Sequence, residues 1–143
     1  MNKEPLKIVL VDDHKIIRNL YKKHLESTKL FTIIADFEDG VTAIEEIKNL
    51  SPDIILVDIN MSPVNGIYVT EKILQNNPDL KILGLSVKNQ PAYAKHMIQL
   101  GAKGYLTKTS PIEEIVNGIL EVHNGKTYIC EEVRKKMDAE DNS

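Results

Sequence analysis

Five short apolar runs alternate with segments of helical length, and this rhythm constrains the fold more than any other feature of the chain. The first four runs are rich in Ile, Val and Leu and lack a clean polar alternation, which is typical of strands buried on both faces of a parallel sheet. The fifth run is short, and only its place in the rhythm marks it as a strand. The runs are Leu6–Val11, Phe31–Phe37, Ile54–Val57, Ile82–Leu85 and Gly104–Leu106.

The intervening segments carry apolar residues three and four positions apart, which indicates amphipathic helices. Pro52 and Pro78 follow two of these segments and Gly101 follows a third, as residues that end helices often do. Ser110 and Pro111 provide a cap and a first-turn proline for the last one. Strand and helix therefore alternate five times. We predict an α/β fold, a single (βα)5 domain with a parallel sheet covered by helices on both faces.

The length of 143 residues corresponds to one domain with a short extension. We assign residues 1–125 to this domain and residues 126–143 to a C-terminal tail or linker, because the pattern changes after Gly125. Within the tail we expect a short helix over Glu131–Lys136. Asp138–Ser143 is small and polar, and we expect it to fray.

Charge and cysteine content exclude several classes of protein. With 18 basic and 21 acidic residues the net charge is −3, which disfavours wrapping of nucleic acid, because that requires Lys and Arg to neutralise phosphates. Cys130 is the single cysteine, so an internal disulfide and a cysteine-rich zinc site are excluded. No apolar run approaches the length of about 18 residues that suits a membrane span, and no signal peptide pattern is present. We therefore expect a cytoplasmic protein without membrane attachment.

Polar residues follow the apolar runs where the predicted strands end: Asp12-Asp13, Asp58, Ser86 and Lys108. In a parallel sheet these ends meet at one edge, where ligands bind. Three carboxylates favour a hard cation such as Mg²⁺, and a hydroxyl and an ammonium suit the oxygens of a transferred phosphoryl group. Asp58 stands alone on its strand and is the best candidate for a nucleophile that forms an aspartyl phosphate. Taken singly, the same residue types are also typical of helix caps, turns and solvated surface.

The motifs around these positions, taken together and in order, resemble those of the response-regulator receiver domain of two-component signalling, over about residues 5–125. The Asp-Asp-His start and the last motif are most similar to the regulators that carry a helix-turn-helix domain of the NarL/LuxR kind. The resemblance implies a flavodoxin-like (CheY-like), doubly wound, five-stranded parallel sheet with strand order 2-1-3-4-5. The motifs are Val11-Asp12-Asp13-His14, Val57-Asp58-Ile59-Asn60-Met61, Gly66, Leu85-Ser86-Val87 and Gly101–Lys108.

The resemblance also implies the roles of the acidic residues. Asp58 matches the phosphoacceptor. Asp12 and Asp13 match the acidic pair that binds Mg²⁺, with Asp58 and the backbone carbonyl of Asn60 as the other protein ligands. His14 lies beside this pair, and we interpret it as a neighbour without a chemical role.

Three further residues have implied roles after the fourth and fifth strands. Lys108 matches the catalytic lysine that pairs with a phosphoryl oxygen. Ser86 matches both a catalytic group and the switch hydroxyl that turns towards the phosphoryl group, and Tyr105 matches the switch aromatic with inward and outward positions. One departure is visible, since the family usually has proline where this chain has Ser62, with Pro63 one position later. We expect the loop over the site to keep its length and to differ in shape.

The favoured function is phosphorylation-dependent signalling, in which a sensor histidine kinase supplies the phosphoryl group with Mg²⁺ as cofactor. We expect no enzyme activity beyond the transfer of the domain's own phosphoryl group and its loss. We also expect homodimerisation on phosphorylation. DNA binding would require a C-terminal helix-turn-helix domain, and this chain carries no recognition-helix segment. We therefore expect that the chain by itself does not bind DNA specifically and that it is the N-terminal part of a transcriptional regulator. The alternative is a free-standing receiver.

Two functions from other classes compete with this one. A small phosphatase that forms an aspartyl phosphate would want a second acid two residues after its nucleophile, where this chain has Asn60. A nucleotide- or flavin-binding module would want a glycine-rich phosphate loop after the first strand, where this chain has carboxylates.

Overall fold

The apolar runs of the sequence form strands that all pair in parallel in one sheet. The computed structural model describes residues 4–141. The strand order is β2-β1-β3-β4-β5-β6, so the predicted order of the first five strands is confirmed, and a sixth strand extends the sheet beyond β5. The strands are β1 (Leu6–Val11), β2 (Phe31–Phe37), β3 (Ile54–Asp58), β4 (Ile82–Ser86), β5 (Gly104–Thr107) and β6 (Tyr128–Ile129).

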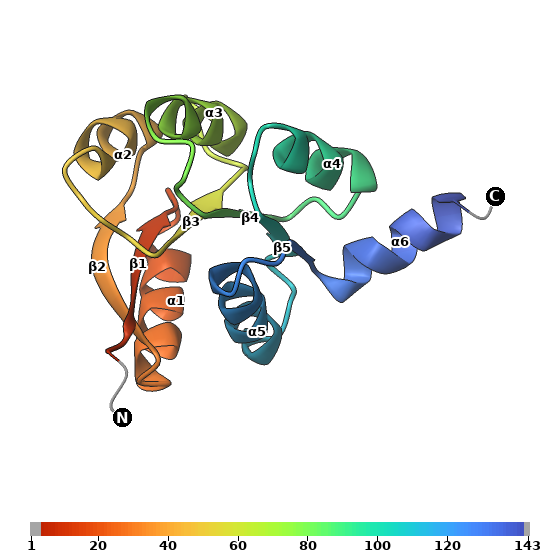
Figure 1. Cartoon of the computed structure of the whole chain (residues 1–143), viewed down its shortest axis with the longest axis horizontal. Coiled ribbons are helices and arrows are strands. Elements are labelled where there is room, and N and C mark those ends of the chain that lie inside the picture. Colours follow the sequence, from red (N-terminus) through yellow and green to blue (C-terminus); the bar gives the residue numbers. More distant parts are fainter. Residues whose placement is uncertain (1–3, 142–143) are drawn as a thin grey trace.

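Helices cover both faces of the sheet, as the alternation predicted. In Figure 1, α2, α3 and α4 lie on one face, α1 and α5 lie on the other, and α6 extends from the edge formed by β5 and β6. The helices are α1 (Lys15–Ser27), α2 (Gly40–Ile47), α3 (Gly66–Asn76), α4 (Pro91–Gln99), α5 (Ile112–His123) and α6 (Glu131–Asp141). The predicted cap at Ser110 is wrong, because α5 begins one residue later than expected. Pro111 is its N-cap residue, and no side chain caps the helix.

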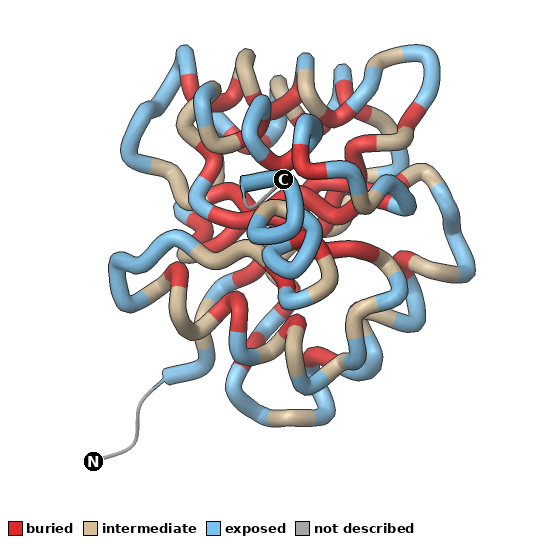
Figure 2. The backbone as a smooth tube through the Cα atoms, turned by 90° about the vertical axis from the view of Figure 1, so that its right-hand side faces the viewer, coloured by how far each residue is buried: buried red, intermediate tan, exposed pale blue. Residues whose placement is uncertain are grey.

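The core explains why the central strands lack polar alternation. Every residue of β3 and β4 is buried, because helices pack on both sides of them. At the edge of the sheet, β2 begins with a buried Phe31, an exposed Thr32 and a buried Ile33. Figure 2 shows the buried segments gathered through the middle of the molecule, between outer surfaces that are mostly exposed. Each large aliphatic side chain buried in this way contributes about 1.5–3 kcal/mol to folding.

The register of the sheet brings the carboxyl ends of four strands together. Val11 of β1 pairs with Val57 of β3, and Asp58 pairs with Leu85 of β4. Ser86 in turn pairs with Thr107 of β5. The residues that follow these positions therefore lie at one edge of the sheet.

The chain after α5 is more ordered than the sequence pattern indicated. Gly125, with φ of +92°, turns the chain out of α5 towards β6, a conformation that glycine adopts at little cost. The helix α6 was expected to end near Lys136, and the expectation of fraying from Asp138 is wrong as far as Asp141, the last residue described. Cys130 and Val133 are completely buried, and α6 contacts α4. Such tertiary contacts stabilise a helix whose local sequence pattern is weak.

Candidate functional site

Three carboxylates meet at the carboxyl edge of the sheet. Asp58 is the last residue of β3 and is completely buried, while Asp12, directly after β1, is 3% exposed. Ligand atoms of Asp12, Asp13, His14 and Asp58 all lie within 4.8 Å of one another. The structure thus brings together the acidic residues that the strand ends singled out.

Lys108, directly after β5, contributes positive charge to this cluster at the same edge of the sheet. Its Nζ lies 3.2 Å from Asp12 Oδ2 and 3.2 Å from Asp58 Oδ2, and its side chain is 12% exposed. The backbone N–H of Lys108 donates to the carbonyl of Ser86, which fixes the turn after β5 beside the end of β4. One ammonium group cannot neutralise three carboxylates, so the cluster keeps an excess of negative charge.

Burial raises the pKa of Asp58, and the neighbouring Asp12 raises it further. The Asn60 N–H, which donates to Asp58 Oδ1 at 2.9 Å, and the ammonium of Lys108 both act in the opposite direction. The balance remains upward, because a buried carboxylate loses its hydration. The charged form of Asp58 therefore gains strongly from a cation placed beside it.

Two buried carboxylate oxygens test whether a metal ion suits this cluster. Asp13 Oδ1 and Asp58 Oδ2 accept no hydrogen bond from any residue in the described part of the chain. Asp13 Oδ1 lies 3.2 Å from His14 Nδ1 and Asp58 Oδ2 lies 3.2 Å from Lys108 Nζ, but a buried carboxylate oxygen that accepts no hydrogen bond is still costly in free energy. Mg²⁺ takes oxygen ligands and keeps several waters, so a few carboxylates on an open edge suit it. The donor set of the cluster fits Mg²⁺.

His14 lies in the cluster itself, although the sequence suggested only a neighbour. Its Nδ1 is 3.2 Å from Asp12 Oδ1 and 3.2 Å from Asp13 Oδ1, and its side chain is 56% exposed. Its backbone N–H also donates to Asp12 Oδ1 at 2.8 Å. The position directly after the acidic pair was the available signal, but the direction of the ring depends on the helix start that follows.

Ser86 is completely buried and is held by a side chain that the sequence analysis did not assign. Its Oγ donates to Oδ1 of Asn60 at 2.8 Å, and the same amide oxygen accepts the N–H of Val87 at 3.1 Å. The N–H of Lys88 donates to Ser86 Oγ at 2.9 Å. Asn60 was expected to contribute only its backbone carbonyl, and here its side chain determines where the Ser86 hydroxyl points.

Tyr105 of β5 is in the inward position, with no exposed surface. Its hydroxyl donates to the carbonyl of Lys88 at 2.5 Å, and burial raises the pKa of this phenol. Lys88 therefore contacts both Ser86 and Tyr105, since its N–H donates to the Ser86 hydroxyl and its C=O accepts from the Tyr105 hydroxyl.

Two residues support the backbone around the cluster: Arg18, which the sequence motifs did not single out, and Gly66, which they did. Arg18, which is 8% exposed, donates from Nη1 to the carbonyl of Asp12 at 2.6 Å and from Nε to Asp36 at 3.0 Å. Gly66 is needed because a Cβ at this position would collide with the backbone of Asp58 and Ile59, where α3 passes close to the end of β3. In the loop between them, the N–H of Ser62 donates to Asp13 Oδ2 at 3.4 Å.

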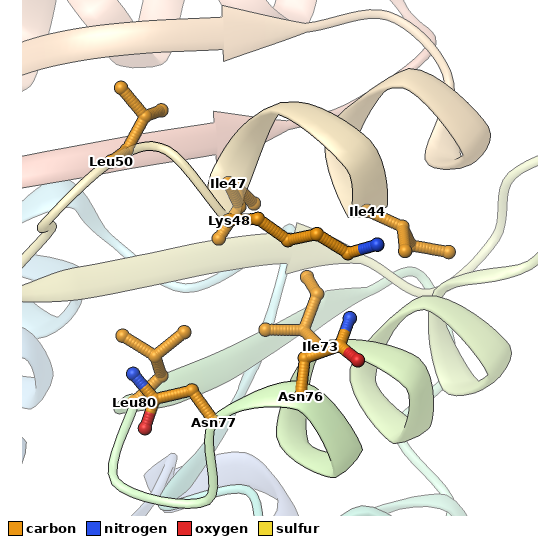
Figure 3. A pocket seen from close by; sticks show the side chains of 8 residues that line it. All are labelled: Ile44, Ile47, Lys48, Leu50, Ile73, Asn76, Asn77 and Leu80. Atoms are coloured by element: carbon orange, nitrogen blue, oxygen red, sulfur yellow. The ribbon is translucent and has the colours of Figure 1, made fainter.

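A separate cavity of about 220 Å³ lies between α2 and α3 (Figure 3). It is at the amino ends of β3 and β4, opposite the acidic cluster. Its walls combine aliphatic side chains with Lys48, Asn76 and Asn77 and hold no carboxylate, so it offers none of the chemistry of the cluster. The lining residues are Ile44, Ile47, Lys48, Leu50, Ile73, Asn76, Asn77 and Leu80.

Comparison with known proteins points to one family. The family model described as "Response regulator receiver domain" matches residues 8–120. The transcriptional regulatory protein DegU of Brevibacillus brevis is 36% identical over 137 residues, which are 96% of this chain and 58% of DegU. The oxygen regulatory protein NreC of Staphylococcus epidermidis is 34% identical over 125 residues, which are 87% of this chain and 57% of NreC. The chain thus spans less than three fifths of the length of these relatives.

The fold of the chain is also similar to that of solved structures. A two-component response regulator of the LuxR family from Aurantimonas sp. SI85-9A1 superposes with a TM-score of 0.93 and 27% identity, covering 97% of this chain and 99% of that one. Among residues 4–141, no helix has the length and apolar character needed to cross a membrane.

Proposed function

Because the chain belongs to the response regulator receiver family, in its NarL/LuxR-type branch, we propose that it takes a phosphoryl group onto Asp58 and passes the resulting change on as a signal. The observation that carries this proposal is the completely buried Asp58 carboxylate, which lies beside Lys108 and has one oxygen without a hydrogen bond. A carboxylate in such surroundings is desolvated and therefore reactive towards an electrophilic phosphorus.

Mg²⁺ would be held by the carboxylates of Asp12, Asp13 and Asp58 and by the backbone carbonyl of Asn60. When bound, it would neutralise negative charge on the phosphoryl oxygens and so allow a carboxylate to approach them. Arg18 supports this role, because its bond to the Asp12 carbonyl holds the turn that carries the acidic pair.

The transfer itself is a displacement at phosphorus. A carboxylate oxygen of Asp58 forms the new P–O bond while the P–N bond to a histidine of the kinase breaks, and the electron pair leaves with the imidazole nitrogen. Lys108 pairs with a phosphoryl oxygen, which its position 3.2 Å from Asp58 Oδ2 favours. Hydrolysis of the aspartyl phosphate would reset the domain, and both steps would be the domain's own activity.

The switch follows from the bonds of Ser86. To donate to a phosphoryl oxygen, its hydroxyl must leave Oδ1 of Asn60. Ser86 also accepts the N–H of Lys88, whose carbonyl holds Tyr105, so the movement extends into the loop before α4. Phosphorylation would thereby shift an equilibrium between two arrangements of this loop.

The partners of the domain are part of the same proposal. They are a sensor histidine kinase as phosphoryl donor, a second copy of the chain after phosphorylation and, through a C-terminal helix-turn-helix domain outside this sequence, DNA. The relatives DegU and NreC are named as regulatory proteins, which supports a transcriptional output over a free-standing receiver. A location in the cytoplasm, where such a kinase domain and DNA are accessible, belongs to the proposal as well.

Mass spectrometry of the intact chain tests the acceptor. Acetyl phosphate with Mg²⁺ is expected to add the mass of one phosphoryl group to the wild type and to Asp79→Asn, an exposed control remote from the cluster. Asp58→Asn is expected to add none. Uptake that persists in Asp58→Asn would reject Asp58 as acceptor, and steady hydrolysis of p-nitrophenyl phosphate by the wild type would favour the phosphatase alternative.

A further inference from the structure

The helix α6 is attached to the rest of the chain by tertiary contacts with β6 and α4. Val133 is completely buried, and the guanidinium of Arg134 lies 5.6 Å from the ring centre of Tyr128 and donates to the carbonyl of Ile129 at 2.7 Å. Lys95 of α4 approaches Glu140 at 3.9 Å. The helix therefore rests on β6 and α4 and is held at several points.

Glu132 connects α6 to two loops of the sheet edge at once. Its Oε2 accepts a bond of 2.7 Å from the side chain of Asn89, in the loop between β4 and α4. Its Oε1 accepts bonds from the hydroxyls of Thr107 at 2.9 Å and Thr109 at 3.1 Å, on either side of Lys108. These bonds lower the pKa of Glu132, so its carboxylate is the form that holds the helix. Lys136, one turn further on, donates to the other end of the Asn89 amide at 2.8 Å.

Asn89 is the next residue after Lys88, and Lys88 holds both switch residues. The N–H of Lys88 binds the hydroxyl of Ser86, and its carbonyl binds that of Tyr105. A series of hydrogen bonds, joined by the peptide bond between Lys88 and Asn89, thus runs from Asn60 through Ser86 to Glu132 on α6. At its near end, this series contains the bond that Ser86 must give up in order to reach a phosphoryl group.

We propose that α6 is the output element of the switch: Glu132 fastens it to the loop that follows Ser86 and to the residues on either side of Lys108, and phosphorylation of Asp58 weakens that attachment. The inference rests on the proposed function. When the Ser86 hydroxyl turns away from Asn60, its bond with Lys88 is disturbed, and Asn89 moves with its neighbour. The arrangement that binds α6 and the arrangement that binds the phosphoryl group then exclude one another.

Coupling of this kind is reciprocal. If the phosphoryl group disfavours attachment of α6, attachment of α6 disfavours the phosphorylated arrangement by the same factor. Loosening α6 by mutation must therefore strengthen binding of beryllofluoride, which mimics the phosphoryl group at equilibrium.

Hydrogen exchange on the full chain tests whether phosphorylation of Asp58 loosens α6. Amides of α6 are expected to exchange at least about fivefold faster after acetyl phosphate and Mg²⁺ are added than with Mg²⁺ alone, while amides of β1 keep their protection. The intact mass of the same sample reports the phosphoryl group. No gain in mass would count against the proposed function. A gain in mass with unchanged or slower exchange in α6 would overturn the present inference alone.

Two variants test the reciprocal effect, in which loosening α6 strengthens binding of beryllofluoride, by calorimetric titration with beryllofluoride and Mg²⁺. Glu132→Gln and Asn89→Ala cut the same connection from opposite sides. Each is expected to speed exchange in α6 before any ligand is added and to lower the Kd of beryllofluoride, by up to the factor seen in the exchange experiment. The matched control is Glu131→Gln, since Glu131 lies on the same helix and its carboxylate pairs at 3.1 Å with the exposed Lys135.

The control is expected to leave both exchange and Kd at their wild-type values. An unchanged Kd in Glu132→Gln and Asn89→Ala, with α6 already exchanging faster, would overturn the coupling, because α6 would then be loosened without any effect on the site.

Discussion

At the scale of single residues, the acidic cluster combines close like charges with the half-buried ammonium of Lys108. Asp12 and Asp58 share Lys108, while Asp13 Oδ1 accepts no hydrogen bond from the described residues. Like charges at this distance repel by about 1 kcal/mol even when water screens them well. The cluster is therefore destabilising for the metal-free fold and useful once a cation binds.

Replacement of Asp13 by Asn separates these two effects. Without Mg²⁺, Asp13→Asn is expected to raise the free energy of unfolding by about 1 kcal/mol and Tm by about 4 °C, because one repelling charge is removed. With Mg²⁺ at a hundred times its Kd the wild type gains about 2.7 kcal/mol, and the variant is expected to lose most of this gain. Thermal melts over a Mg²⁺ titration measure both effects.

Asp79→Asn serves as the control for that titration, since it removes an equal charge from an exposed turn. A variant at position 13 that keeps the full Mg²⁺ response would show that Asp13 is not a ligand.

At the scale of elements, the half-buried Tyr128 of β6 joins this strand to the two helices beside it. The hydroxyl of Tyr128 donates to Glu114 Oε2 of α5 at 2.7 Å, and the same carboxylate oxygen accepts the N–H of Glu131 at the start of α6. Burial, and then the carboxylate of Glu114, raise the pKa of Tyr128 to about 12. The neutral phenol is therefore the form that joins α5, β6 and α6.

This shift predicts how stability depends on pH. Since the folded pKa lies above the ordinary value of 10.0, the contribution of Tyr128 is complete below pH 10 and is lost as the pH rises through about 12. At neutral pH, Tyr128→Phe is expected to lower the free energy of unfolding by about 1 kcal/mol. Urea denaturation of the wild type and of Tyr128→Phe measures the difference between their free energies of unfolding. This difference is expected to shrink as the pH rises above 10. A difference that stays constant would contradict the stabilising role of the neutral Tyr128 phenol.

At the scale of the whole molecule, a receiver signals by changing what it associates with. We expect the wild type to sediment as a monomer of 16.1 kDa with Mg²⁺ alone and to shift towards twice that mass when acetyl phosphate is added. The reason is that phosphorylation shifts the population of one arrangement, and a partner that prefers this arrangement stabilises it by mass action.

Analytical ultracentrifugation across a range of protein concentrations measures this association, with Asp58→Asn as the variant expected to stay monomeric under all conditions. A phosphorylated protein that remains monomeric at every concentration would remove dimerisation from the proposal, and the phosphoacceptor assignment would stand.

Much of the molecule follows from the chain itself. Buried strands require continuous apolar runs and helices require a three-to-four spacing, so both can be read locally. Once parallel strands are inferred, Asp12, Asp58 and Ser86 must meet at one edge because each ends its run. Family motifs supplied the strand order and the implied roles, which composition and spacing alone leave open.

Only the tertiary structure decided the rest. The bond from Ser86 to Asn60, the support of Asp12 by Arg18 and the place of the His14 ring each depend on side-chain directions set by packing. β6 and the full length of α6 were missed for the same reason, since two residues make no recognisable strand and α6 is stabilised by contacts with distant parts of the chain. Periodicity is a property of neighbours along the chain, whereas these contacts join residues that only the folded backbone brings together.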